Sequence, residues 1–216
     1  MTPRHLVLAA GAAVLLAACS VGKPVPQATT YVIEAATPEP VAAAPRIPET
    51  LRMGNVRMAA AFSGNLLVYR MDDVNFVSDP YQTFIADPGS MLGNVMATWL
   101  NRSGVFKSVT QPGSTQSAPY VLEATVTELY GDFRSGKSPA AVIAIQFALV
   151  DQTGVRPKIV YEGTIDRRET IAQALPGALV RGYGKAMSEI LTQLVADIDP
   201  KTVRPAAEAK PVFDRR

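Results

Sequence analysis

The sequence predicts a single α+β domain in which a mostly antiparallel, mixed sheet packs against two principal helices. The chain has 216 residues, which suits one hydrophobic core and is short for two. Three β-rich segments follow one another between residues 120 and 167, with turn residues in the gaps. Apolar residues recur at helical spacing in residues 88–102 and 176–198. We therefore expect one domain over residues 30–199.

The first part of this domain contains short β-prone segments. They cover residues 31–33, 51–60, 66–70, 74–77 and 81–85. Four prolines predict a loop between the first two segments, over residues 35–48. Gly64 and Asn65 favour a hairpin between the second and third segments. Asp79 and Pro80 predict a break between the last two.

The first helix has clear start and stop signals. Asp87 suits the N-cap position, and Pro88 suits the first helical position. Apolar residues then keep helical spacing as far as Leu100, and Gly104 predicts the C-terminal stop. A short strand is expected next, over residues 105–110.

The second half of the domain is predicted to be a meander followed by a helix. The three strands are expected over residues 120–130, 141–151 and 159–167. Turn residues in both gaps, among them Gly136 and Gly154, favour antiparallel neighbours. Only Gln146 interrupts the apolar run of the middle segment, which is typical of a central strand. Pro176 opens the last helix, and the mixed composition of residues 200–216 predicts a disordered tail.

The rarity of histidine and cysteine excludes several kinds of site. His5 and Cys19 are the only such residues, and both lie in the first twenty positions. A mature domain without them cannot hold a zinc site of the His/Cys type, a Ser/His/Asp triad or a disulfide. The formal charge is +2, and no GxxxxGK[ST] loop is present to hold a nucleotide phosphate. We therefore expect no catalysis, no cofactor and no nucleic-acid partner.

The N-terminus has the pattern of a lipoprotein signal peptide. A short charged segment precedes an apolar run over residues 6–18, which is too short to span a bilayer. The run ends in Leu-Ala-Ala-Cys at Cys19, which resembles the lipobox of bacterial lipoproteins, where the cysteine thiol receives a diacylglycerol. We expect a signal peptide over residues 1–18, acyl chains on Cys19 and a tether over residues 19–29. By resemblance to sorted lipoproteins, Ser20 favours the outer membrane, with the domain in the periplasm; an inner-membrane or surface-exposed lipoprotein is the alternative.

The charged residues do not predict a catalytic or metal site. Glu128, Asp132 and Arg134 lie close together, and a carboxylate pair can do acid–base chemistry. We favour a strand end or bulge eased by Gly131, with the charges in water. The aspartates within residues 72–79 lack the spacing of an EF-hand, so we predict no metal ligands there.

Aromatic residues alternate with charged residues and proline near residue 80. Aromatic side chains bury a large area at little entropic cost, so they are favoured anchors in protein interfaces. The same residues are equally compatible with the core of a sheet. We take this region as a candidate partner-binding site, made of Tyr69, Arg70, Asp79, Tyr81 and Phe84.

Short motifs are spread along residues 31–199. They are Leu67–Arg70, Asp79–Tyr81 with Phe84, Met91–Leu92, Trp99–Leu100, Ser103–Gly104 with Phe106, Pro112–Ser114 and Glu128–Arg134. Together, in this order, they resemble the auxiliary lipoprotein family of ABC-type lipid transporters. That family includes the lipoprotein of the paraquat-inducible system associated with MCE proteins.

This resemblance implies a periplasmic domain that acyl chains hold at the outer membrane. Its partners would be an MCE-domain protein, a permease and an ATPase, which move phospholipid or related molecules between membranes. The chain would be a non-catalytic docking or conduit component, and a homo-oligomer is a hypothesis because some members form rings. Two alternatives stay open: a regulator of a cell-wall synthase, and an assembly partner of an outer-membrane protein. Both would share the anchor, the tether and a small α+β domain.

Overall fold

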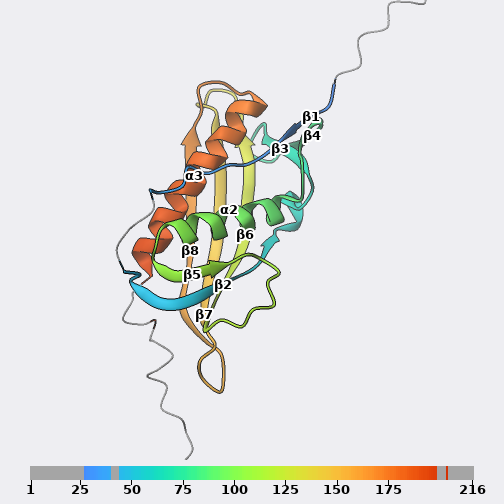
Figure 1. The fold of residues 1–216 in the computed structure, drawn as a ribbon. Helices are drawn as coiled ribbons and strands as arrows, with labels where there is room; N and C mark the ends of the chain where they lie inside the picture. Colours follow the sequence, from blue (N-terminus) through green and yellow to red (C-terminus); the bar gives the residue numbers. More distant parts are fainter. Residues whose placement is uncertain (1–26, 40–43, 199–202, 204–216) are drawn as a thin grey trace, which may run out of the picture.

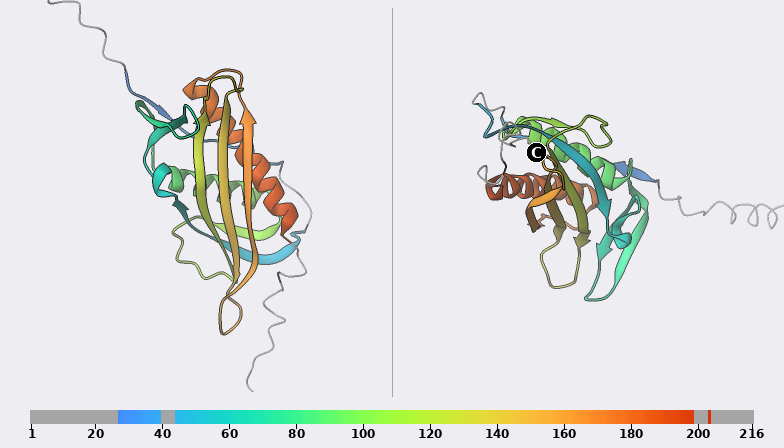
Figure 2. Two further views of the ribbon diagram at one scale, coloured as in Figure 1. Left: turned by 180° about the vertical axis from the view of Figure 1, so that it is seen from behind. Right: turned by 90° about the horizontal axis from the view of Figure 1, so that it is seen from below.

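An eight-stranded mixed sheet carries two helices on one of its faces (Figures 1 and 2). The computed structural model describes residues 27–39, 44–198 and 203. The elements are β1 (Thr29–Tyr31), β2 (Ile47–Met58), the short 3-10 helix η2 (Ala60–Phe62), β3 (Leu66–Arg70), β4 (Phe76–Phe84), α2 (Pro88–Arg102), β5 (Phe106–Thr110), β6 (Tyr120–Asp132), β7 (Ala140–Asp151), β8 (Lys158–Thr170) and α3 (Pro176–Asp197). The predicted α+β class is confirmed.

Strand β6 is the centre of the sheet. Along one edge it pairs antiparallel with β7, which pairs antiparallel with β8, so the predicted meander is confirmed. Two parallel partners share its other edge: β2 lies opposite residues 120–126, and β3 lies opposite residues 131–132. β5 lies beyond β2, whereas β4 and then β1 lie beyond β3.

The predicted hairpin between residues 51–60 and 66–70 is wrong. β2 and β3 are not paired with each other, because each pairs in parallel with β6. The helix η2 and a bend at residues 64–65 lie between the two strands. This linker carries the chain onward along β6, whereas a two-residue turn would fold it back onto β2.

Two prolines lie inside strands where the sequence predicted a break or a loop. β4 continues through Asp79 and Pro80, and its ladder with β3 skips residues 80–82. Pro80 therefore lies in a bulge, where the missing N–H removes no ladder hydrogen bond. Pro48 likewise lies in β2, at an irregularity between residues 47 and 50. The strands are longer than predicted because both irregularities accommodate proline.

The helices begin and end as the sequence predicts. Asp87 caps α2 by accepting a hydrogen bond from the Ser90 backbone N–H at 2.7 Å, and Pro88 is the first helical residue. Gly104 follows α2 with φ of 66°, a conformation that favours glycine. α2 packs on β2 and β5, and α3 packs on β7 and β8 (Figure 1).

The core lies between the sheet and the helices. Its wholly buried side chains include Leu92, Leu100, Leu122, Ile143, Phe147, Tyr183 and Leu191. Val203 is also buried against this core, although it falls in the predicted tail, so packed residues extend beyond the expected boundary at residue 199. The predicted signal peptide, Cys19, most of the tether and the rest of the tail lie outside the described residues.

Residues 32–37, here called the strap, cross α3 and contact α2 (Figure 1). The carbonyl oxygen of Ala36 accepts two hydrogen bonds, from Trp99 Nε1 on α2 at 3.1 Å and from Ser188 Oγ on α3 at 2.9 Å. Ile33 of the strap is buried in the core. One backbone carbonyl therefore links the two helices to each other.

Glycine at position 184 lets the strap lie against α3. A Cβ atom at this position would overlap the carbonyl oxygen of Glu34. We expect Gly184→Ala to lower the free energy of unfolding by about 1–2 kcal/mol. Because the overlap is with backbone, overpacking costs about 2–3 kcal/mol, the upper part of its usual range, and the gain in helix propensity is only about 1 kcal/mol. Urea denaturation measures this change.

The matched control for this variant is Gly64→Ala. A Cβ atom at Gly64 meets nothing within 4 Å, so we expect that variant to unfold close to the wild-type midpoint. A Gly184→Ala protein as stable as its control would contradict the close contact between the strap and α3.

Candidate functional site

The five partner-binding residues predicted from the sequence all lie on strands β3 and β4. These strands pair antiparallel, so the residues belong to one hairpin. Phe84 differs from the others because it is buried, with its ring centroid 6.5 Å from that of Tyr183. We therefore leave Phe84 out of the candidate contact surface.

Tyr69 and Asp79 hold the two strands of the hairpin together. The Tyr69 hydroxyl donates a hydrogen bond to Asp79 Oδ2 at 3.2 Å, and its ring stacks on Phe133 with the centroids 5.0 Å apart. Burial raises the pKa of Tyr69, and the neighbouring Asp79 carboxylate raises it further. Asp79 Oδ1 also accepts a hydrogen bond from the Tyr81 backbone N–H at 2.9 Å. Both side chains are thus engaged within the protein.

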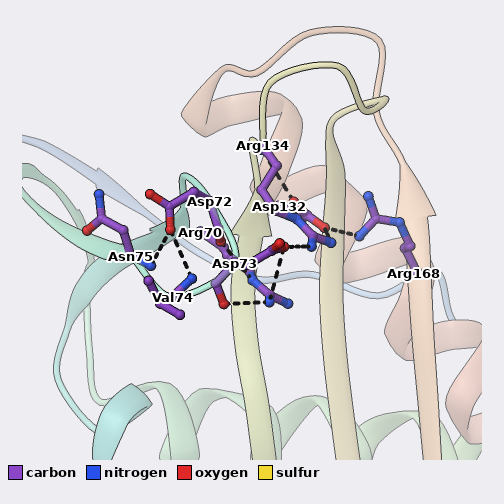
Figure 3. A network of polar contacts seen from close by, with 8 residues as sticks. All are labelled: Arg70, Asp72, Asp73, Val74, Asn75, Asp132, Arg134 and Arg168. Carbon is purple, nitrogen blue, oxygen red and sulfur yellow. Dashed lines mark hydrogen bonds and ion pairs between the residues drawn. The ribbon is translucent and has the colours of Figure 1, made fainter.

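Arg70 shapes the turn between β3 and β4 (Figure 3). Its Nε and Nη2 atoms donate hydrogen bonds to the carbonyl oxygens of Asp72 and Asp73, at 3.1 and 2.9 Å. Asp72 Oδ1 accepts hydrogen bonds from the backbone N–H groups of Val74 and Asn75, at 2.9 and 2.7 Å. These local contacts fix the backbone of the turn.

A buried carboxylate joins this turn to the end of the sheet (Figure 3). Asp132 is wholly buried at the end of β6 and accepts hydrogen bonds from Arg134 at 2.7 and 2.9 Å, and from Arg168 of β8. Arg134 also donates to Asp73 Oδ1 at 2.8 Å. The hydrogen bonds from Arg134, together with those from Arg168, hold the pKa of Asp132 well below its usual range. The contacts therefore connect the turn to both β6 and β8.

The prediction that these charges face water is wrong for Asp132. The bulge in β6 lies between residues 126 and 128, and Gly131 continues the ladder with β7 while it faces Leu179 of α3. Asp132 is buried because two guanidinium groups surround it and satisfy its oxygens. Sequence reasoning missed Arg168, which lies 36 residues away and is brought near only by strand pairing.

Exposed apolar side chains are concentrated on the same hairpin. Among the described residues, eleven large hydrophobic side chains are substantially exposed, and seven of them lie between residues 66 and 85. Tyr81 is 41% exposed in the bulge of β4, and Val74 is 89% exposed in the turn. The other five are Leu66, Met71, Phe76, Val77 and Ile85. Such a concentration is typical of an interaction surface.

The aspartates of the hairpin are engaged within the protein. Those at positions 72, 73 and 79 accept hydrogen bonds from backbone or arginine groups of the protein itself.

Within the described ranges, no helix has the length and apolar character needed to cross a membrane.

We expect Asp132→Asn to lower the free energy of unfolding by about 2–3 kcal/mol at neutral pH. Loss of the charge leaves Arg134 and Arg168 without their buried anion, and the partial exposure of Arg168 moderates the cost. Asp73→Asn is the matched control: it removes an exposed partner of Arg134, so we expect stability close to wild type. Equal effects of the two substitutions would contradict the role assigned to Asp132.

The stability difference between wild type and Asp132→Asn should also depend on pH. The pKa of Asp132 is lower in the folded chain than the value of about 3.9 expected when unfolded. Its contribution is therefore fully present above about pH 5 and is lost as the pH falls toward the folded pKa. Urea titrations at a series of pH values should show the two proteins converging in acid; a constant difference would contradict this linkage.

The fold is similar to that of two solved structures. Protein XCC0632 from Xanthomonas campestris, of the family DUF330, matches with a TM-score of 0.67 and 18% identity over 78% of this chain and 93% of that chain. The hypothetical protein CT253 from Chlamydia trachomatis matches with a TM-score of 0.50 and 11% identity over 69% of this chain and 94% of that chain. Identities this low show a shared fold alone.

The family comparison covers most of the domain. No curated protein matches the chain. The sequence model of one family, described as the ABC-type transport auxiliary lipoprotein component, matches residues 31–199, from the end of β1 through the whole of α3. The chain therefore belongs to the ABC-type transport auxiliary lipoprotein component family.

Proposed function

We propose that this chain is the outer-membrane lipoprotein of an ABC-type MCE lipid-transport system, and that its periplasmic domain docks other components without catalysis. The observation that carries the proposal is the family match over residues 31–199. In this scheme a cytoplasmic ATPase supplies the energy, a permease and an MCE-domain protein carry phospholipid, and this chain completes the outer-membrane end.

Cys19 is the attachment point in this proposal. It ends the apolar run of the signal peptide in a lipobox-like context. Seven residues lie between Cys19 and Gln27, where the described structure begins, and the eight steps from one residue to the other span at most about 29 Å. The domain would therefore work close to the membrane that holds its acyl chains.

The contact surface in this proposal lies on β4. Tyr81 projects from the bulge that Pro80 and the Asp79 side chain define, and Val77 and Ile85 are exposed on either side of it in the sequence. An exposed aromatic ring is a favoured anchor for a protein partner. Tyr69 and Arg70 support this surface from β3 by fixing the hairpin.

Substitution of Cys19 tests the anchor. We expect Cys19→Ala to abolish fractionation with the outer membrane, because no acyl chain can then be attached. Sucrose-gradient fractionation of cell membranes followed by immunoblotting measures the distribution. Ser20→Ala is the control and should stay in the outer-membrane fraction. Unchanged fractionation of Cys19→Ala would overturn the proposed attachment point.

Site-specific photo-crosslinking tests the partner. A photoreactive amino acid at Tyr81 should capture an MCE-domain protein in intact cells, identified by mass spectrometry after affinity purification. The matched control places the same group at Ile159, which is 53% exposed on β8. Capture of a cell-wall synthase or an outer-membrane barrel in place of the transport proteins would overturn the proposed function. Equal capture from both positions would overturn the proposed surface.

A further inference from the structure

We propose that the turn between β3 and β4, residues 71–75, lies against the surface of the bilayer that holds the acyl chains. This inference rests on the lipid anchor of the proposed function and adds a second, non-covalent contact with the same membrane. The ligand is the lipid surface itself, at the level of the headgroups and the first methylenes.

The turn presents apolar side chains to solvent. Val74 is the most exposed large hydrophobic residue of the hairpin at 89%, and Met71 and Phe76 on either side are both more than a third exposed. Side chains of this kind gain free energy when they move from water into the boundary between headgroups and acyl chains.

The structure holds the turn in this conformation. The Asp72 carboxylate binds the backbone N–H groups of Val74 and Asn75, and Arg70 binds the carbonyl oxygens of Asp72 and Asp73. Arg134, itself bound to the buried Asp132, also holds Asp73 (Figure 3). Because the backbone is fixed, Val74 can enter the membrane surface without the entropic cost of ordering a flexible loop.

The direction of β1 places the anchor on the side of this turn. β1 pairs in parallel with the last part of β4, with Thr29 opposite Gln82, and β4 begins just after the turn, at Phe76. The chain before Thr29 therefore leaves the sheet toward the turn. At about 3.3 Å per residue, the six steps from Phe76 to Gln82 span about 20 Å, which is shorter than the reach of the tether.

The opposite end of the sheet is much farther from the anchor. The loop that joins β7 and β8 lies at the far end from β1 in Figure 1 and in the left view of Figure 2. β7 has 12 residues, so its two ends are about 36 Å apart. Val155 in that loop is 98% exposed and provides a reference position of the same residue type.

The charges around the turn do not oppose contact with lipid. Asp72, Asp73 and the buried Asp132 are offset by Arg70, Arg134 and Arg168, and Lys137 adds a further positive charge that acts on Asp73. A surface region whose net charge is small and slightly positive is repelled neither by zwitterionic lipids nor by anionic lipids.

A lipid surface also fits the small size of the contact. A stable protein–protein interface buries about 1,200–2,000 Å² in total, far more than three side chains of one turn provide. Because the tether would keep the domain within about 30 Å of the bilayer, the effective concentration of the lipid surface is high, and a contact of this size is sufficient.

Environment-sensitive labelling of the lipidated full-length protein tests the proposal. Cys19 is the only cysteine of the chain, so once it carries lipid, Val74→Cys or Val155→Cys supplies the only free thiol for a nitrobenzoxadiazole label. Each labelled protein is reconstituted into vesicles of phosphatidylethanolamine and phosphatidylglycerol, with and without lipids that carry a quencher in the upper acyl chain.

We expect the label at position 74 to shift to shorter wavelength and to lose at least half of its emission to the lipid quencher, whereas the label at position 155 stays water-like and unquenched. Water-like emission at both positions, in protein that floats with the vesicles, would overturn the membrane contact and leave the anchor intact. If the emission at position 74 shifts to shorter wavelength only after the transport proteins are added, the turn contacts a protein and not lipid, which would also overturn the membrane contact. Protein that does not float with the vesicles would overturn the anchor and this inference together.

Discussion

The architecture depends on one constraint: the C-terminal end of β6 must hold the β3–β4 hairpin through only two residue pairs. β2 already occupies the first half of the same edge of β6, so little backbone is left for β3. A backbone hydrogen bond from Phe133 to Arg70 and several side chains supply the rest of the attachment. Asp132 connects through Arg134 to the turn, and the ring of Phe133 stacks on Tyr69. On the face away from the helices, Tyr130 and Val142 pack against Val68. The buried carboxylate thus helps to position the surface on which the proposed contacts lie.

The strap provides a second connection, from the N-terminus to the helices. β1 pairs with β4 at the edge of the sheet, and the next residues cross α3 and contact α2. The carbonyl oxygen of Ala36 binds both helices, and Gly184 leaves room for the backbone at Glu34. If the N-terminus is anchored in a membrane as proposed, a force on the chain there would act on the edge of the sheet and on both helices together, and not on β1 alone.

The sequence predicted those features that depend on local chemistry and periodicity. The cap formed by Asp87, the first helical residue Pro88 and the meander of three long strands all follow from neighbouring residues, and all are confirmed. The parallel pairing of β2 and β3 with β6 was not predictable, because it depends on contacts between residues about 60–70 positions apart. Pro80 was misread for a related reason: proline ends a strand only where its N–H would be needed, and the bulge removes that need. For the candidate site, the aromatic residues near residue 80 pointed to the hairpin. The burial of Asp132 was not predictable, because it requires Arg168 from a strand that is distant in the sequence.

The hairpin combines two properties that the needs of folding alone do not explain. Several of its apolar side chains remain in water, where they contribute little to the core. At the same time, its turn is fixed by ion pairs and by a buried carboxylate, an arrangement with a large desolvation cost. The carboxylate also attaches the hairpin to β6, but that attachment does not require apolar side chains to remain in water at the tip. Both make sense if the apolar tip must be presented in one orientation to a surface outside the domain, because a rigid tip loses little entropy on binding. The position of β1 beside β4 would bring that tip close to the proposed membrane anchor, so the same geometry that stabilises the hairpin also limits what it can reach.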